Sequence, residues 1–359
     1  MSTPAAEAGS PIRRIPVSLL TGFLGSGKTT LLRKMLQHPG WSDAAVLVNE
    51  LGAVGLDHQL AWSASGSMLV LENGCICCSA RDDLVNTLEE LFWNRLQKKI
   101  PRFNRVIIET TGLADPGPII KELFSHPLIA ERYRLESVVC TVDAVFGLQQ
   151  LESHPESLAQ AGSADMILLT KTDIANPDDA RTLETRLRQM NPLANVHASG
   201  ALSAEFMSGA MPWSELEHRL RLRGEIDPVE THGAVDAPEA DGPAASRYLF
   251  HRRVQSTVIH FPHPWKLDAI TRALRQVLDL YGDRVLRIKG RIMVEHEDRD
   301  AVVQVVQRMI FPFERIAAPV GGKAQNFIVC ITLGVALADL RRPFEEQASP
   351  HADEDDATH

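Results

Sequence analysis

One stretch, residues 22–29, constrains the fold of this chain more than any other. It reads Gly-Phe-Leu-Gly-Ser-Gly-Lys-Thr and fits the phosphate-loop pattern of Gly, four residues, then Gly-Lys-Ser/Thr. An apolar run, Val17–Leu20, precedes it, and residues 30–36 continue at helical spacing. In that context, glycines let backbone N–H groups wrap around phosphates at a helix N-terminus. The stretch predicts binding of a nucleoside triphosphate, and the plainer alternative is a glycine-rich turn with a solvated lysine.

A second element, an apolar strand that ends in an acidic residue, supports this interpretation. Residues 106–108 are Val-Ile-Ile, Glu109 follows, and Gly112 comes three positions later. In P-loop NTPases the acid at this strand end orients Mg²⁺ or its water, and the glycine N–H senses the γ-phosphate. We therefore expect Lys28, Glu109 and Gly112 to be catalytic, with Thr29 and Glu109 at the Mg²⁺. The expected nucleotide contacts in the phosphate loop are Gly22, Gly25, Ser26, Gly27, Lys28, Thr29 and Thr30.

A third element indicates which base is bound. Thr170-Lys171-Thr172-Asp173 follows the apolar run Met166–Leu169, where GTPases carry an Asn/Thr-Lys-x-Asp signature. The Asp173 carboxylate can accept from both N1–H and the exocyclic amine of guanine, a pairing that adenine does not offer. Lys171 would lie along the base, and the turn 198–200 is a candidate to cover its other side. We expect Thr170, Lys171 and Asp173 to select GTP, whereas the alternative is a polar turn that opens a helix.

Three cysteines crowd into one turn, Cys75-Ile76-Cys77-Cys78, directly before a helical pattern. They are too close for a sensible internal disulfide, but they can present two or three thiolates to a metal such as Zn²⁺. Thiols just ahead of a helix have lowered pKa values, which favours metal binding or redox chemistry. Metal binding is the preferred interpretation, and a redox sensor or buried structural cysteines are the alternatives. The turn does not complete a tetrahedral shell, so Glu50, at the end of the second strand, and Asp57 are candidate further ligands.

Composition excludes several classes of protein. The 359 residues carry a net charge of −9, which argues against a general nucleic-acid binder. The sequence contains no run of 18 apolar residues, so it predicts no membrane span. The N-terminus lacks an apolar signal core. We therefore expect a cytoplasmic protein without membrane or nucleic-acid partners. The five cysteines are not a disulfide framework, which suits a reducing cytosol. Cys140 and Cys330 lie inside apolar runs and are expected in the core, and His260 and His263 are expected in a structural turn.

The chain divides into two expected domains. Apolar runs alternate with helical patterns up to residue 200, which predicts a mostly parallel sheet covered by helices on both faces. A smaller α+β domain with a mostly antiparallel sheet follows a Pro/Gly-rich linker. The expected boundaries are 1–14 for a disordered tail, 15–223 for the P-loop domain, 224–246 for the linker, 247–342 for the second domain and 343–359 for an acidic tail. In the second domain we expect strands at 254–259, 285–288, 292–295, 313–317 and 327–332, and helices at 265–281 and 301–309.

Together these motifs resemble the CobW-type family of phosphate-loop GTPases, which is related to HypB and UreG. The resemblance runs from about residue 15 to residue 340 and includes Asn49-Glu50-Leu51-Gly52 and Tyr281-Gly282. It implies a slow, metal-regulated GTPase that uses GTP and Mg²⁺, binds Zn²⁺ or Co²⁺, and delivers the metal to a client protein. In the family pattern Cys77, Cys78 and Glu50 would hold the transferable metal, joined by Cys75.

Two positions depart from the family pattern, and two rival functions stay open. Ala53 stands where many relatives carry a second glutamate, and the linker and tail hold only His232, His351 and His359 instead of a histidine-rich segment. One rival is a cobalt-directed activator for cobalamin synthesis or nitrile hydratase. The other is a regulatory switch in which the metal or thiol state gates GTP binding. The sequence also leaves open the client and whether the chain forms a homodimer.

Overall fold

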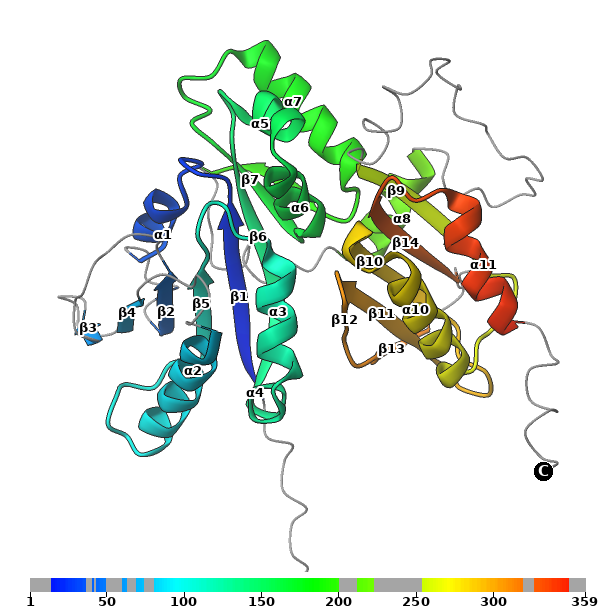
Figure 1. Ribbon diagram of the computed structural model, residues 1–359, viewed down its shortest axis with the longest axis horizontal. Coiled ribbons are helices and arrows are strands. Elements are labelled where there is room, and N and C mark those ends of the chain that lie inside the picture. The colour runs from blue at the N-terminus through cyan, green and yellow to red at the C-terminus, as the bar shows by residue number, and fades with distance from the viewer. Residues whose placement is uncertain are drawn as a thin grey trace, which may run out of the picture.

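The computed structural model describes residues 14–36, 41, 43–49, 60–62, 69–73, 81–199, 212–222, 254–318 and 326–348. Within this part the chain builds two sheets, each with its own helices (Figure 1). The cysteine turn, Glu50, the expected linker and most of both tails lie outside the described residues.

The first sheet has eight strands in the order β3-β4-β2-β5-β1-β6-β7-β8, and every pairing is parallel except β3 with β4. Apolar residues run through its strands without polar alternation because both faces are covered, as expected for a parallel sheet. Its strands are β1 (Ile15–Gly22), β2 (Ala44–Asn49), β3 (Leu60–Trp62), β4 (Leu69–Asn73), β5 (Arg105–Glu109), β6 (Tyr133–Asp143), β7 (Met166–Thr170) and β8 (Asn195–Ala198).

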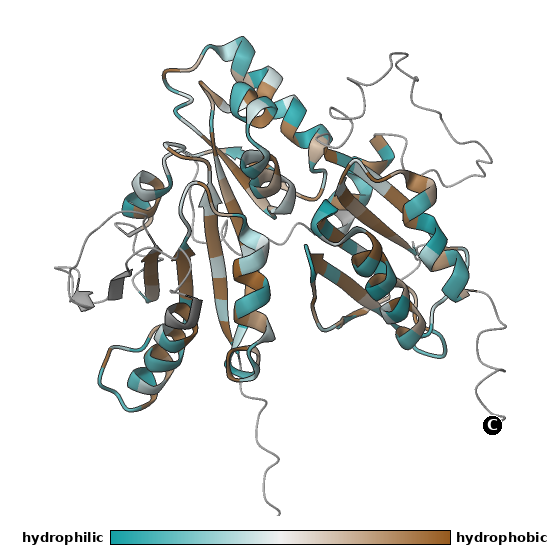
Figure 2. Cartoon of the chain, viewed as in Figure 1, coloured by the Kyte–Doolittle hydropathy of each residue, from teal (hydrophilic) through white to brown (hydrophobic). Residues whose placement is uncertain are grey.

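Helices lie on both faces of this sheet, as the sequence predicted. Leu31 and Met35 of α1 pack in one cluster with Leu20, whereas helices α2 and α3 pack against Val17 and Leu19, which point to the opposite face. Brown apolar strands between helices with teal outer surfaces show this layering (Figure 2). The helices are α1 (Lys28–Leu36), α2 (Arg81–Leu96), α3 (Pro116–Ser125), α4 (Pro127–Arg132), α5 (Gly147–Ser153), α6 (Pro155–Ser163), α7 (Pro177–Met190) and α8 (Trp213–Leu222).

Local sequence signals explain where several of these helices begin. Asp115 caps α3 by accepting the Gly117 N–H at 3.1 Å, and Pro116 occupies the first helical position, where its missing N–H has no intrahelical acceptor. Asn176 caps α7 in the same way through the N–H of Asp178. Each of these caps therefore fixes the loop that joins a strand of the sheet to the following helix.

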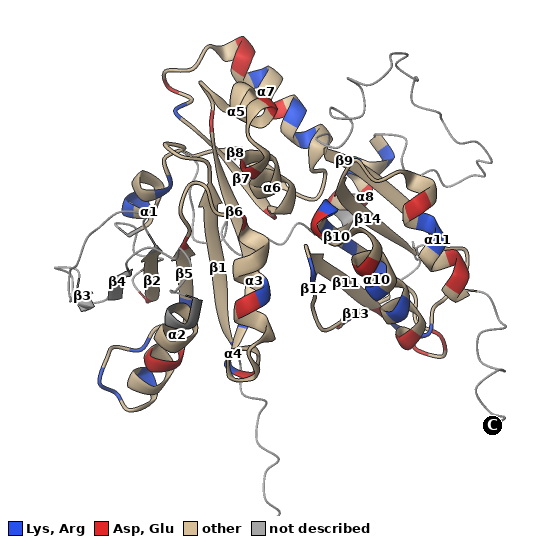
Figure 3. Cartoon of the chain, viewed as in Figure 1, with Lys and Arg blue, Asp and Glu red and all other residues tan. Residues whose placement is uncertain are grey.

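The second sheet has the order β12-β11-β10-β14-β9, with β13 paired to β11, and all these pairings are antiparallel. Helices α10 and α11 cover one of its faces, with Leu274 and Phe344 in the same core cluster as Ile288. Charged residues are frequent along α10, α11 and α7 (Figure 3). The elements are β9 (Val254–His260), α10 (Leu267–Tyr281), β10 (Val285–Ile292), β11 (Arg299–Val306), β12 (Met309–Ile310), β13 (Glu314–Ala317), β14 (Phe327–Leu333) and α11 (Leu337–Ala348), with a 3-10 turn at Gly282–Arg284.

Four details of the sequence interpretation are corrected here. The helix expected at 301–309 is strand β11 followed by β12, and the strand expected at 292–295 is absent because β10 ends at Ile292. Strand β3, which pairs antiparallel with β4 at the sheet edge, was missed. Helix α11 was also missed, and it continues to Ala348, so an acidic tail cannot begin at 343. The error at 301–309 arose because the strand is buried on both faces, so its apolar residues run on without the alternation that marks a strand.

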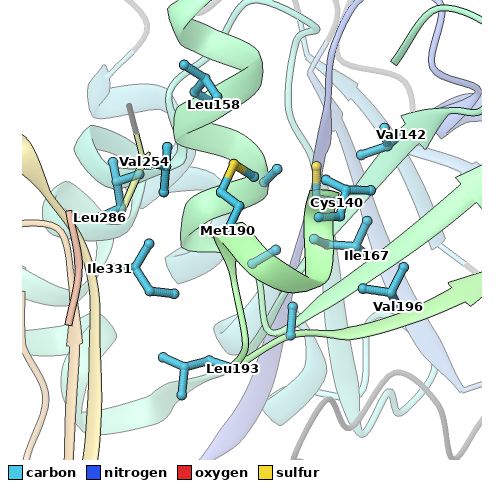
Figure 4. Packing of buried hydrophobic residues seen from close by; sticks show 14 of the residues in the cluster. Cys140, Val142, Leu158, Ile167, Met190, Leu193, Val196, Val254, Leu286 and Ile331 are labelled. Atoms are coloured by element: carbon cyan, nitrogen blue, oxygen red, sulfur yellow. The ribbon is translucent and has the colours of Figure 1, made fainter. Parts of the chain in front are cut away.

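The two sheets share one hydrophobic core. Leu286 and Ile331 of the second sheet pack in a single cluster with Leu158, Met190 and other side chains of α6, α7 and β6 (Figure 4). At the edge of this cluster Arg287 forms a buried ion pair with Asp165, whose other carboxylate oxygen accepts the N–H of Val138 at 2.9 Å. Because a buried ion pair is stable only when both partners are in place, this contact fixes how the second domain sits on the first.

No helix among the described ranges is both long enough and apolar enough to span a bilayer.

Candidate functional site

The phosphate loop links β1 to α1 as the motif predicted. Gly22, the last residue of β1, has φ = +140°, and a Cβ at this position would lie 2.3 Å from Thr141 Oγ1. Only glycine combines this backbone angle with so close an approach to β6. Gly25 and Gly27 also have positive φ, so the loop turns sharply before α1 begins at Lys28. The backbone N–H groups of the first helical turn have no intrahelical acceptor, which suits this position to an anion.

The side chains of the loop are held by its own backbone and by β6. Lys28 is 8% exposed, and its Nζ donates to Gly22 O at 2.8 Å and to Phe23 O at 3.3 Å. The Ser26 hydroxyl lies 2.6 Å from the Thr141 hydroxyl, and the Ser26 carbonyl accepts from the Thr170 hydroxyl at 2.7 Å. The lysine ammonium therefore lies against the carbonyls at the start of the loop, and the Thr170 hydroxyl links the loop to the end of β7.

The two residues expected at the Mg²⁺ are neighbours. Thr29 Oγ1 donates to Glu109 Oε1 at 2.8 Å, and Glu109, the last residue of β5, is 2% exposed. A hydroxyl and a carboxylate beside a phosphate loop are the hard oxygen donors that Mg²⁺ prefers. The residues present fit a Mg²⁺ that is carried by the nucleotide phosphates.

Gly112 lies against the phosphate loop. A Cβ at Gly112 would stand 2.7 Å from both the Cα and the N of Leu24, so this position has room for no side chain. Thr110, two residues before Gly112, anchors the segment to β1, because its N–H donates to Leu20 O at 2.9 Å. The structure thus brings Lys28, Glu109 and Gly112 to one edge of the sheet.

The expected base-binding residues follow β7 at the same edge. Lys171 has φ = +56°, and its Nζ forms an ion pair with Asp143 Oδ2 at 2.6 Å. Asp173 is exposed in the turn before α7. In this turn the N–H groups of Ile174 and Ala175 donate to Lys171 O. Ser199 continues from β8 beside Leu169, and the next residue of the expected covering turn, Gly200, lies outside the described residues.

Asp143 is a site residue that sequence reasoning missed. It ends β6 with its side chain 2% exposed, and its Oδ1 accepts the Val145 N–H at 2.8 Å while Oδ2 holds Lys171. A signal was available, because Asp143 is the polar residue that terminates the apolar run 138–142 at a carboxyl strand end. This is the position where α/β proteins place ligand-binding residues.

The expected metal ligands Cys75, Cys77, Cys78 and Glu50, and the further candidate Asp57, lie outside the described residues. The strands that lead into them are described, and their register is informative. Asn49 at the end of β2 pairs with Asn73 at the end of β4, and Val48 pairs with Glu109 of β5. Adjacent strands lie about 4.8 Å apart, so the chain enters both segments within roughly 10 Å of the Glu109 backbone. In the part of the chain that can be described, no cluster of three His, Cys, Asp or Glu residues could hold a metal.

The two cysteines outside the turn, Cys140 and Cys330, lie in the core. Cys140 and Cys330 are buried, and burial raises the pKa of each thiol to about 12. His263 is exposed, and its carbonyl accepts the Asn326 side chain in the turn after β9. The sequence interpretation of the two thiols as core residues is confirmed.

Comparisons with known proteins match this arrangement. Residues 16–198 match the family profile of the CobW/HypB/UreG nucleotide-binding domain, and residues 254–348 match that of the cobalamin synthesis protein cobW C-terminal domain. The zinc chaperone YjiA of Escherichia coli is 35% identical over 82% of this chain and 87% of its own length. The zinc-regulated GTPase metalloprotein activator 1 of Schizosaccharomyces pombe is 31% identical over 52% of this chain and 46% of its own length.

Among solved structures, that of the Zn(II)-bound YjiA GTPase from E. coli covers 94% of this chain and 100% of its own, with a TM-score of 0.66 and 30% identity. The first profile takes in the phosphate loop, Glu109, Gly112 and the 170–173 segment, and the second takes in the sheet that docks on α6 and α7. On these grounds the chain belongs to the CobW/HypB/UreG family.

Proposed function

We propose that this protein is a GTP-hydrolysing metallochaperone that binds Zn²⁺ through the cysteine turn and Glu50 and transfers it to a client protein. One observation carries the proposal. The ends of β4, β2, β5 and β1 lie in register, through the pairs Asn49 with Asn73, Val48 with Glu109, and Leu20 with Glu109. The nucleotide site and the two segments that hold the candidate metal ligands therefore leave the sheet side by side. The names of the two relatives, a zinc chaperone and a zinc-regulated GTPase activator, support the same function.

Each residue of the nucleotide site has a proposed role in hydrolysis. Lys28 binds the β- and γ-phosphates and offsets the charge that develops on the leaving oxygen. Thr29 and Glu109 hold Mg²⁺, which supplies charge neutralisation between the phosphates when bound. The Gly112 N–H contacts the γ-phosphate, and Asp143 holds Lys171 where its side chain can lie along the guanine. We expect the metal cargo to be coupled to this cycle, because the chain enters the Glu50 segment from the end of β2, where Val48 pairs with Glu109 of the nucleotide site.

This coupling predicts that the nucleotide changes Zn²⁺ affinity. We expect the dissociation constant for Zn²⁺, measured by competition with a chromophoric chelator, to be at least about tenfold lower with Mg²⁺ and a non-hydrolysable GTP analogue than with Mg²⁺·GDP, or roughly 1.4 kcal/mol of coupling. The GTP-loaded protein would then be the carrier, and hydrolysis would release the metal. A parallel titration with Co²⁺ separates a zinc chaperone from the cobalt-directed rival. Equal Zn²⁺ affinities in the two states would refute the chaperone cycle.

Guanine selection predicts a change of base preference in one variant. Asp173→Asn replaces one acceptor oxygen by an NH₂ donor. This donor would face the 2-amino group of guanine, which is also a donor, whereas it can donate to the 2-carbonyl of xanthine. We expect the affinity for GTP to fall roughly thirtyfold, about 2 kcal/mol, and that for xanthosine triphosphate to rise. Fluorescent-nucleotide competition measures both. Asp178→Asn, the same change at an exposed position five residues along, serves as the control and should bind GTP normally. Unaltered GTP binding by Asp173→Asn would place the base elsewhere.

A further inference from the structure

The loop between β5 and α3, residues 110–115, is held in place at several points along its length. Its first residue bonds to β1, as described, and the Ala114 N–H donates to Thr111 O at 3.1 Å. Its middle residue, Gly112, lies against Leu24 of the phosphate loop. A shift of this loop therefore changes the nucleotide site directly.

Gln160 of α6 fastens the middle of the 110–115 loop. Its side chain is fully buried, and its Nε2 donates to Gly112 O at 3.2 Å and to Ala114 O at 3.0 Å. Two bonds from one amide to alternate carbonyls restrain the backbone on both sides of Leu113. Because the Gly112 N–H belongs to the same restrained segment, Gln160 limits where that N–H can point.

Gln307 fastens the end of the same loop from the second domain. It lies in the turn between β11 and β12 with φ = +47°, and its own N–H donates to Leu286 O at 3.1 Å. Its side-chain amide donates to Asp115 Oδ1, the same oxygen that accepts the Gly117 N–H and so caps α3. A Cβ at Gly117 would stand 1.6 Å from Gln307 Oε1, so this glycine is what lets the glutamine reach the cap.

Helix α6 connects the same partners by a second route. His154, just before α6, stacks on Phe23 of the phosphate loop with ring centroids 4.5 Å apart. At the other end of α6, Gly162 faces Leu286 closely enough that a Cβ would lie 2.4 Å from Leu286 Cδ1, and the Ser163 hydroxyl lies 3.5 Å from Leu286 O. The Leu286 carbonyl that receives Gln307 is thus seated on the helix that carries Gln160.

We propose that Gln307 of the second domain is a positioning residue for GTP hydrolysis, which acts through Asp115 on the 110–115 loop. When Gln307 bonds to Asp115, it holds the loop so that Gly112 faces the γ-phosphate. When this bond is broken, the loop loses its link to the second domain. The rate of hydrolysis therefore depends on how the second domain is docked, and a partner that shifts the β11–β12 turn changes that rate. This inference rests on the proposed GTPase function, and it adds that the second domain contributes to the reaction.

A negative charge introduced at position 307 tests the contact between Gln307 and Asp115. Gln307→Glu faces Asp115 with a second carboxylate, which is poorly accommodated because burial already raises the pKa of Asp115 above its usual value. We expect kcat for GTP to fall about tenfold, with GDP affinity within twofold of wild type because GDP makes no γ-phosphate contact. Combining it with Asp115→Asn should restore kcat to within threefold, since the new amide at 115 can donate to the new carboxylate at 307 and still accept the Gly117 N–H. Gln307→Ala, which adds no charge, should lower kcat severalfold.

Gln276→Glu is the matched control. Gln276 of α10 donates to Glu346 of α11 at 2.6 Å on the exposed surface, so the same substitution brings two carboxylates together in the second domain, on the sheet face away from the P-loop domain. It introduces the same residue beside a carboxylate but outside the contact with the 110–115 loop, so it should leave kcat unchanged. The inference is overturned if Gln307→Glu hydrolyses GTP within twofold of wild type, if the double variant shows no rescue, or if GDP affinity falls in step with kcat. A wild-type protein that hydrolyses no GTP would overturn the proposed function as well, so the two failures are distinguishable.

Discussion

Lys28→Ala should lower kcat for GTP hydrolysis about a thousandfold. The lysine ammonium lies at the mouth of the phosphate loop, 2.8 Å from Gly22 O, and is the loop's only cationic side chain. A preorganised donor aimed at charge that develops in the transition state contributes about a hundred- to a thousandfold, and the full charge of lysine places it at the upper end of that range. The measurement is steady-state phosphate release at saturating GTP.

The fold should survive this substitution, because the two carbonyls that Lys28 Nζ contacts, Gly22 O and Phe23 O, belong to its own loop and not to a distant element of the fold. Circular dichroism and the melting temperature should therefore stay close to those of wild type. Lys34→Ala, an exposed lysine on the same helix α1, is the control and should hydrolyse GTP at the normal rate. Turnover by Lys28→Ala within threefold of wild type would show that residues 22–29 do not form the catalytic loop.

Cys77→Ser combined with Cys78→Ser should abolish tight Zn²⁺ binding. Loss of a residue that only supports a metal ligand weakens binding about 10- to 100-fold, so removal of two proposed thiolate ligands should raise the dissociation constant at least about a thousandfold. Competition with a chelator of known affinity measures the change. Unchanged affinity would place the metal elsewhere in the protein.

Thiol labelling gives an independent test of the same variant. Cys140 and Cys330 are buried and their pKa values are raised to about 12, so neither should react with iodoacetamide in the folded protein. Labelling of native wild-type protein should then be confined to the three cysteines of residues 75–78, and Zn²⁺ should suppress it. The double serine variant should retain one reactive thiol whose labelling no longer responds to Zn²⁺. Reaction at Cys140 or Cys330 in the native protein would contradict this assignment.

The parallel sheet could be predicted because its signals are local. Val17–Leu20 and Met166–Leu169 are buried on both faces of the sheet. A glycine-rich motif follows the first and a Lys-x-Asp motif follows the second, each at a fixed spacing. The strand, the turn and the next helix could therefore be predicted from neighbouring residues. The side chains at the carboxyl edge of that sheet could be placed for the same reason. Asp143 could have been found by the rule that located Glu109.

Contacts between distant segments could not be predicted in this way. Most of residues 301–306 are buried, with Ala301, Val303 and Val305 packed in the cluster of α10 and Val306 in a cluster of the first domain, and that burial hides the strand period. The bond from Gln307 to Asp115 joins residues 192 positions apart, and no spacing rule connects them. Such contacts follow from how the two domains dock, which depends on the shape of both surfaces rather than on either local sequence.

The core that the two sheets share has a consequence during biosynthesis. Ribosomes release the first sheet, complete at Ala198, well before β14 ends at Leu333, and at 5–20 residues per second the interval is roughly 7 to 27 s. During that time Leu158, Ala161 and Leu193 lack the Leu286, Phe327 and Ile331 side chains that later cover them. The nascent P-loop domain thus has an exposed apolar surface until the second domain is synthesised. Faster translation shortens the time in which this surface can associate with other chains.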